Sequence, residues 1–331
     1  MNLVKGIWIR DIAIYHPAMV RDNEYFINFY EEKGFFAKFL AEENFGRDKR
    51  YIIKTGTGET SVTMATTACK RVLAKLGMSG KDIDVICFCS LTPDYLSPPG
   101  ALMIHNAIDG KPETICYDLN ANCVGMIYAF DQLSKYMAAV TDVKRALLVG
   151  AESLSLMFSP LDIVNNICFG DSACAVVVEK TDDQSKFVDT GYYANSKQIK
   201  AAKSPLCGMG YITKAPKDKL FYSLKPVDIS CTHSVEKVKE MLAEHNLEVS
   251  DLKLICTSQF ARTLGENFCI ELGATSEQWI YVGDKYGYTG ANSPFICLLE
   301  AIQANRVHRG DYVLLWTVGA STQYIWSLIR F

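Results

Sequence analysis

The chain has 331 residues, of which 49% are apolar and 21% charged, and its formal net charge at pH 7 is −3. Such a composition is typical of an ordinary globular protein with a sizeable core, and the nearly balanced charge argues against nucleic acid as a partner. No apolar run approaches the roughly 18–20 residues that a membrane span needs.

The cysteines and the N-terminus predict a cytoplasmic protein. The chain starts without the apolar stretch and cleavage site of a signal peptide. Its 12 cysteines are scattered through apolar segments, without a CxxC pair or the Cys/His spacing of a zinc site. We therefore expect reduced core cysteines, with neither a metal site nor a disulfide framework.

Helices and strands alternate through the first half of the chain. Residues 22–50, rich in aromatic and charged side chains, predict a helical excursion that covers another part of the fold, with a break at Gly34. Strands are predicted at 4–14, 84–89, 114–118, 146–150 and 175–179. Helices are predicted at 60–76, from the loop at 92–99 to about 108, and at 123–140.

The second half repeats this alternation after a stretch of weak periodicity. We interpret residues 180–225 as a connector or insertion between an N-terminal half (1–179) and a C-terminal half (226–331). Helices are predicted at 231–245, 259–272 and 291–304, and strands at 252–257, 279–283, 311–317 and 323–330. Two similar α/β halves packed together are the simplest architecture.

Cys123 stands out because it lies where the strand at 114–118 gives way to a helix. The free N–H groups and the positive end of the dipole of a helix start favour the thiolate, which attacks thioesters and binds metals. The simpler interpretation of any one cysteine is a buried structural residue. The residues around Cys123 leave both interpretations open.

Five motifs, in order along nearly the whole chain, resemble those of the β-ketoacyl-acyl-carrier-protein synthase III family of the thiolase superfamily. They are Thr92-Pro93-Asp94-Tyr95 with Pro98, the stretch 118–125 around Cys123, Gly150-Ala151-Glu152-Ser153-Leu154-Ser155, Phe169-Gly170-Asp171-Ser172-Ala173, and Gly319-Ala320-Ser321. Each motif alone is weak, but five in register are specific.

The resemblance implies a thiolase-like α/β fold: two similar βαβαβαββ halves in a five-layer αβαβα sandwich. It also implies a homodimer and a narrow tunnel for the phosphopantetheine arm of acyl-CoA or acyl carrier protein, with no permanently bound cofactor. Cys123 would be the nucleophile that takes an acyl group as a thioester. Its own N–H and one from the turn at Ala320 and Ser321 would form the oxyanion hole.

Two departures from the family pattern change the expected chemistry. Where family members carry a His in His-Gln-Ala-Asn, this chain has Ser258, and where they carry an Asn in Gly-Asn-Thr, it has Tyr288. The His and Asn stabilise the enolate during decarboxylation of a malonyl thioester. Losing one such donor typically costs about 100- to 1000-fold in rate, so we expect decarboxylative condensation to be disfavoured. Ser258 and Tyr288 could position an acceptor, or Tyr288 could plug the pocket.

Four basic residues are candidate contacts for the phosphates of coenzyme A or a carrier protein. Arg47, Lys49 and Arg50 lie in the segment equivalent to a basic segment of the family, and Arg262 begins a predicted helix. Each could equally be a solvated surface charge.

Three functions are open on the sequence alone. The first is an acyltransferase that passes the acyl group from Cys123 to a non-malonyl or pre-activated acceptor in specialised lipid or polyketide-type metabolism. The second is a catalytically silent partner of an active paralogue, against which the retained Cys123 argues. The third is ordinary fatty-acid initiation with improvised catalytic groups.

Overall fold

Two mixed β-sheets form the frame of the molecule in the computed structural model, which describes residues 6–182, 186–225, 229–319 and 323–331. The first sheet has the order β1 (Gly6–Tyr15), β7 (Ser172–Thr181), β6 (Arg145–Glu152), β4 (Val85–Cys89), β5 (Ile115–Leu119). The second has the order β11 (Leu252–Cys256), β12 (Tyr312–Gly319), β13 (Gln323–Arg330), β8 (Lys186–Ala194). Strands β4, β5 and β6 are parallel to one another, as are β11 and β12.

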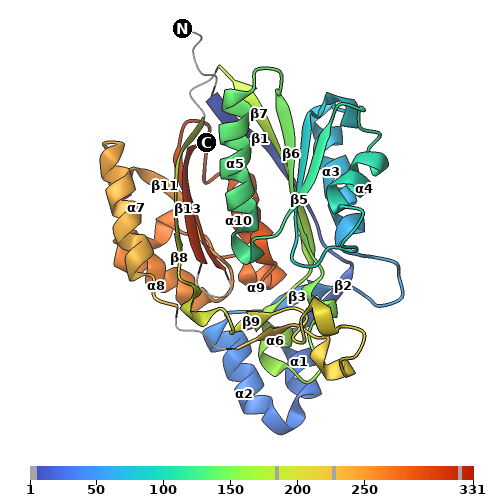
Figure 1. The fold of residues 1–331 in the computed structure, drawn as a ribbon. Helices are drawn as coiled ribbons and strands as arrows, with labels where there is room; N and C mark the ends of the chain where they lie inside the picture. Colours follow the sequence, from blue (N-terminus) through green and yellow to red (C-terminus); the bar gives the residue numbers. More distant parts are fainter. Residues whose placement is uncertain (1–5, 183–185, 226–228, 320–322) are drawn as a thin grey trace.

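Helices fill three further layers, so the predicted five-layer thiolase-like arrangement is confirmed (Figure 1). Helices α5 (Gly125–Ala139) and α10 (Ser293–Gln303) lie between the sheets. Helices α3 (Ser61–Leu76) and α4 (Gly100–Ala107) cover the outer face of the first sheet, and α7 (Thr232–Glu244) and α8 (Arg262–Leu272) that of the second. Among the described residues, no helix is long and apolar enough to cross a membrane.

The smaller elements gather at one end of the sandwich (Figure 1). They are β2 (Met19–Asp22), α1 (Asn23–Phe29), α2 (Gly34–Lys38), a π-helical turn (Phe39–Asn44), β3 (Lys49–Ile52), α6 (Ile163–Cys168), β9 (Ala202–Lys203), β10 (Ser223–Leu224) and α9 (Gly283–Tyr286). The excursion predicted at 22–50 is therefore helical over most of its length, and a new helix begins at Gly34, where the spacing breaks.

Helix α3 illustrates how local sequence sets an element. The Thr60 hydroxyl accepts a hydrogen bond from the Thr63 N–H at the helix start. Gly77 ends the helix with a φ of +66°, a left-handed conformation that glycine adopts without a steric penalty. Between these caps the apolar face is buried against the first sheet. The prediction of a helix at 60–76 ended by Gly77 is confirmed.

Two predictions need correction. The predicted connector 180–225 contains β8, a nine-residue strand at the edge of the second sheet. Its periodicity is weak because its side chains are only partly buried or exposed. The strand predicted at 279–283 shrinks to one bridge between Trp279 and Ile255, and α9 begins at Gly283. Trp279 pairs with β11 in the parallel direction, as β5 pairs with β4 in the first sheet.

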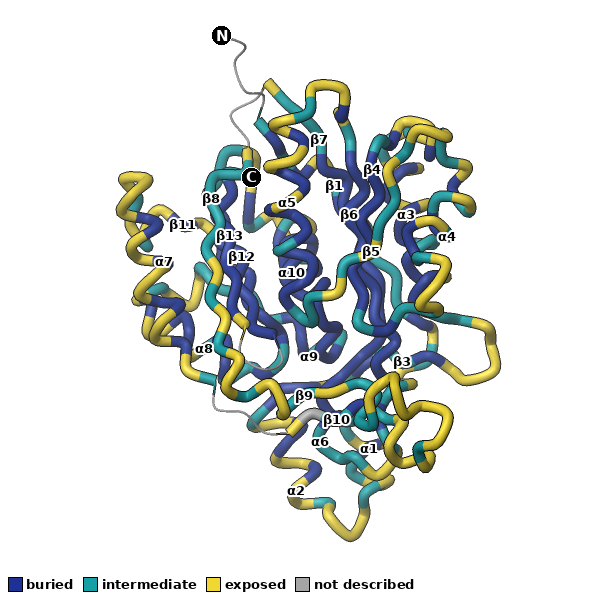
Figure 2. Tube along the Cα trace, in the orientation of Figure 1, coloured by how far each residue is buried: buried dark blue, intermediate teal, exposed yellow. Residues whose placement is uncertain are grey.

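Three apolar clusters hold the layers together, and the sheets and middle helices form the main buried part (Figure 2). The central cluster joins Phe130 of α5 and Phe295 of α10 to both sheets. Beneath α8, Phe268 stacks on Trp316 with ring centroids 4.3 Å apart, and the Trp316 indole donates a hydrogen bond to Ser234 at 3.1 Å.

We expect Phe268→Ala to lower the free energy of unfolding by about 3–5 kcal/mol, because it opens a cavity in this cluster. Phe35→Ala is the matched control, since Phe35 is 89% exposed whereas Phe268 is 0% exposed; it should change stability by less than about 0.5 kcal/mol. Urea unfolding measures both, and equal effects would contradict the layer assignment of α8.

Candidate active site

Cys123 lies in a short turn between strand and helix. After β5 ends at Leu119, Asn122 adopts a left-handed φ of +53° and begins a single 3-10 turn (Asn122–Val124), and α5 follows from Gly125. Asparagine tolerates this conformation better than most side chains. The predicted position of Cys123 at a strand-to-helix junction is confirmed, and its side chain is partly exposed.

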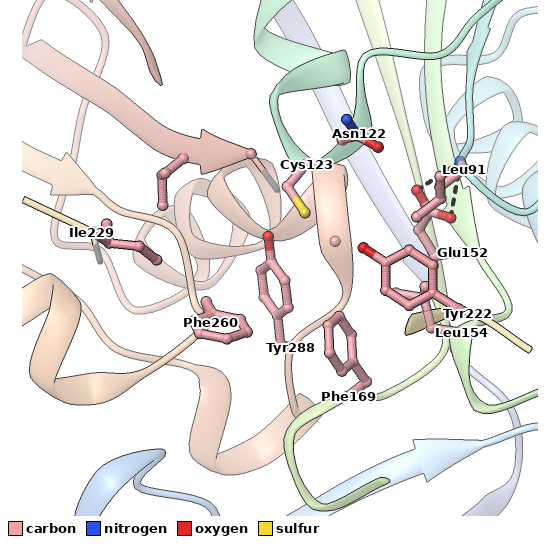
Figure 3. Close-up of a pocket in the computed structure, with 13 residues that line it drawn as sticks. Leu91, Asn122, Cys123, Glu152, Leu154, Phe169, Tyr222, Ile229, Phe260 and Tyr288 are labelled. Atoms are coloured by element: carbon pink, nitrogen blue, oxygen red, sulfur yellow. Dashed lines mark hydrogen bonds between the residues drawn. The ribbon is translucent and has the colours of Figure 1, made fainter. Parts of the chain in front are cut away.

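A cavity lies in front of the Cys123 thiol, at the edge where parallel strands of both sheets end (Figure 3). Leu91 follows β4, Cys123 follows β5, and Glu152 is the last residue of β6. Such an edge is where open α/β sheets bind ligands. The cavity is lined by Leu91, Asn122, Cys123, Glu152, Leu154, Phe169, Tyr222, Ile229, Phe260, Tyr288, Gly290, Val318 and Gly319. Its volume of about 40 Å³ has room for only a few water molecules.

Tyr288 lies beside this thiol, and Ser258 is a neighbour of the Tyr288 hydroxyl. The Tyr288 hydroxyl points toward the Cys123 sulfur (Figure 3), and Tyr288 and Ser258 are 1% and 0% exposed. Burial raises the pKa of Tyr288 well above its ordinary value, and the neighbouring Cys123 raises it further, while Ser258 acts in the opposite direction. Tyr288 is therefore a neutral hydroxyl donor at physiological pH.

The backbone and neighbouring rings hold Tyr288 in place. Its N–H donates to the Cys168 carbonyl and its carbonyl accepts from the Gly170 N–H, each at 2.9 Å. The rings of Phe169 and Phe260 pack around it at centroid distances of 5.1 and 5.5 Å. The aromatic ring thus occupies a wall of the cavity, consistent with the predicted plug.

Two further polar groups of the cavity were missing from the sequence-based candidates. Glu152 is 2% exposed; both its carboxyl oxygens accept from the Leu91 N–H at 3.1 Å, and Oε2 also accepts from the Thr92 hydroxyl at 2.9 Å. Burial raises the pKa of Glu152 to about 8, and these hydrogen bonds oppose the rise. The signal for Glu152 was an acidic residue at the end of an apolar strand.

Tyr222 supplies the second missed group. It is 6% exposed, and its hydroxyl lies between Glu152 and Cys123 in Figure 3. Burial raises its pKa, with further contributions from the charges of Cys123 and Glu152. Tyr222 comes from the segment of weak periodicity, which carried no signal for it.

The prediction that Arg47 and Arg50 contact carrier phosphates is wrong. Arg47 is 1% and Arg50 0% exposed, so neither guanidinium can meet a phosphate at the surface. Arg47 donates instead to backbone carbonyls at 2.8–3.1 Å, those of Phe45, Cys168, Gln259 and Phe260. It thereby ties together three segments beneath the site.

The other two basic candidates remain predictions. Lys49 is partly exposed, with its ammonium 5.9 Å from the centre of the Tyr51 ring. Arg262 is also partly exposed; it lies over the Tyr281 ring and donates to the Gly46 carbonyl at 3.3 Å.

The predicted oxyanion-hole residues Ala320 and Ser321 lie outside the described residues. Gly319, directly before them, lines the cavity. Within the described part of the chain, no group of three or more His, Cys, Asp or Glu side chains is placed to hold a metal ion.

Comparison with family models and curated proteins gives consistent matches. Residues 117–196 match the model described as 3-oxoacyl-[acyl-carrier-protein (ACP)] synthase III, and residues 242–331 match the model of its C-terminal part. The β-ketoacyl-[acyl-carrier-protein] synthase III of Pseudoalteromonas atlantica is 30% identical over 296 residues, which cover 86% of this chain and 88% of the relative. That of Aquifex aeolicus is 28% identical over 273 residues, covering 82% and 85%.

Solved structures agree with the fold. The crystal structure of 3-oxoacyl-[acyl-carrier-protein] synthase III from Aquifex aeolicus matches with a TM-score of 0.86 at 26% identity, covering 98% of this chain and 100% of that one. A priming β-ketosynthase from the R1128 polyketide biosynthetic pathway also gives a TM-score of 0.86, covering 99% and 98%, but at 17% identity this match bears on the fold alone.

We expect Arg47→Met to lower the free energy of unfolding by about 3 kcal/mol or more, because several buried carbonyls lose their donor at about 1 kcal/mol each. Lys49→Met also replaces a basic side chain by methionine, but at a partly exposed position, and should lower the free energy of unfolding by less than about 0.5 kcal/mol. Urea unfolding of the two variants tests this, and a stable Arg47→Met protein would contradict the structural role.

Proposed function

Because the chain belongs to the 3-oxoacyl-[acyl-carrier-protein] synthase III family, we propose that it is an acyltransferase with Cys123 as its nucleophile. It takes an acyl group from acyl-CoA or acyl carrier protein as a thioester on Cys123. It then passes that group to a non-malonyl or pre-activated acceptor, in specialised lipid or polyketide-type metabolism. As the family resemblance implies, we expect the chain to work as a homodimer.

The orientation of Tyr288 is the observation that carries this proposal. A neutral hydroxyl aimed at the Cys123 sulfur can donate to a thiolate, which supports formation and breakdown of a thioester. The same aromatic ring fills space that a malonyl group would need, and Ser258 is a shorter donor than an imidazole. Both substitutions therefore favour acyl transfer over decarboxylation.

The acceptor follows from what the cavity has to offer. With no histidine among the described residues that line it, the cavity offers no imidazole base there to activate a weak nucleophile. An amine, a thiol or a stabilised carbanion needs less activation. The small cavity volume also favours a short acyl group.

A second candidate is the decarboxylative β-ketoacyl synthase activity named in the relatives. It shares the acylation of Cys123 with the first candidate and differs in the fate of the acyl group. Release of carbon dioxide from a malonyl thioester distinguishes the two. A silent partner subunit would accept no acyl group at all.

We expect intact-mass measurement to detect an acyl adduct after incubation with short acyl-CoA donors, and Cys123→Ala to lose it. The unmodified enzyme should release little carbon dioxide from malonyl-CoA or malonyl carrier protein. The double variant Ser258→His with Tyr288→Asn restores the family pair and should raise that release about 100-fold or more. Absence of labelling would favour the silent partner, and rapid release by the unmodified enzyme would favour the synthase.

A further inference from the structure

We propose that Glu152 is the base that takes the proton from the acceptor as the acceptor attacks the Cys123 thioester. The inference rests on the proposed acyl transfer and names the group that completes it. Neither the family models nor the names of the relatives assign Glu152 a role.

The fold brings this carboxyl group to the reacting centre. Because β5 and β6 flank β4 in parallel, the residues at their carboxyl ends face one cavity, and both Cys123 and Glu152 line it. The Tyr222 hydroxyl, whose pKa is raised by the charges of both residues, lies between them in Figure 3. An acceptor that reaches the thioester therefore enters the space that Glu152 and Tyr222 border.

Hydrogen bonds hold the Glu152 carboxyl group in position and leave it able to accept another. The Leu91 N–H is shared by both oxygens, and the Thr92 hydroxyl donates to Oε2 only. A carboxylate has about four acceptor sites, so Oε1 can accept a further proton donor. A Cβ at Gly290 would lie 2.9 Å from the Glu152 Cγ, so the glycine makes room for this side chain.

The titration of Glu152 suits the role. A base works best when its pKa lies near the working pH, and burial raises the pKa of Glu152 to about 8. The described ion pairs include no cation that would hold it ionised.

None of the titratable groups around Glu152 changes charge at the pH where Glu152 itself is half-ionised. Burial raises the pKa of Cys89 and of Tyr222, so both stay protonated. Asp171, with a pKa raised to about 6, is ionised above that pH. Tyr288 remains neutral, and Cys123 carries the acyl group during transfer and does not titrate.

The step balances in atoms and charge. The acceptor heteroatom forms a bond to the thioester carbonyl carbon while its proton passes to the Glu152 carboxylate. The carbon–sulfur bond then breaks, and Cys123 leaves as a thiolate that can accept a hydrogen bond from the Tyr288 hydroxyl. The proton on Glu152 returns to solvent or to the thiolate, which restores the starting state.

Single-turnover transfer tests the proposal with Glu152→Gln, which keeps the size and the acceptor oxygen but removes the base. The enzyme is first acylated with acyl-CoA, and the acyl-Cys123 species is then mixed with a weakly basic amine that stays uncharged above about pH 6.5. We expect Glu152→Gln to acylate Cys123 within about threefold of the unmodified rate but to transfer about 100-fold or more slowly. The unmodified transfer rate should rise with pH up to about 8 and then level off, and this rise should be absent in the variant.

Two further variants secure the interpretation. Glu152→Asp keeps a carboxyl group, so its transfer rate should be lower but should still rise with pH. This variant tests the proposal even if the Gln variant does not fold. Asp171→Asn removes a buried carboxyl that lies outside the cavity lining and should also retain it. Equal transfer by Glu152→Gln and the unmodified enzyme would overturn the role of Glu152 while leaving acyl transfer intact. Failure of the unmodified enzyme to acylate would instead overturn the proposed function.

Discussion

The left-handed turn at Asn122 is the constraint on which the site depends. It reverses the chain directly after β5, so that Cys123 enters the cavity before α5 begins. The second sheet holds this turn from the other side: the Thr317 hydroxyl of β12 donates to the Cys123 carbonyl at 3.4 Å. A Cβ at Gly319 would lie 3.3 Å from Val124, so the end of β12 packs tightly on the turn. The Cys123 sulfur is thus fixed where the carboxyl ends of strands from both sheets meet.

Burial then decides which chemistry this sulfur can perform. Tyr288 and Tyr222 stay protonated at physiological pH because a phenolate would lose its hydration in the cavity. Glu152 is pushed toward the neutral form for the same reason, but only as far as a pKa of about 8. The cavity therefore offers two permanent hydroxyl donors and one group that can exchange a proton near neutral pH.

Apolar periodicity and caps were enough to predict the elements that are buried on one or two faces, such as α3 and β4. The order of five motifs was enough to predict the layered fold. Strand β8 was not predicted because its side chains are partly exposed at a sheet edge. Residues 279–283 have the apolar pattern of a strand but form only one bridge.

For the site, motif order singled out Cys123 and Tyr288, which line one cavity, and Ser258, which neighbours Tyr288 outside the cavity lining. Burial was not readable from residue type: Arg47 and Arg50 resemble surface charges in the sequence, but Arg47 donates to several backbone carbonyls and Arg50 to the Ile167 carbonyl and the Asn23 side chain. Tyr222 reaches the cavity from a loop-rich segment, which only the tertiary structure brings near Cys123.

The fate of the acyl group on Cys123 is the most direct measure of this account. In a rapid-quench experiment, the acyl-enzyme is formed once and its decay is followed with a malonyl thioester or with an amine or thiol acceptor. The account predicts fast decay with the amine or thiol, with the acyl group recovered on the acceptor, and slow decay with the malonyl thioester. Fast decay with the malonyl thioester, accompanied by equimolar carbon dioxide, would contradict it.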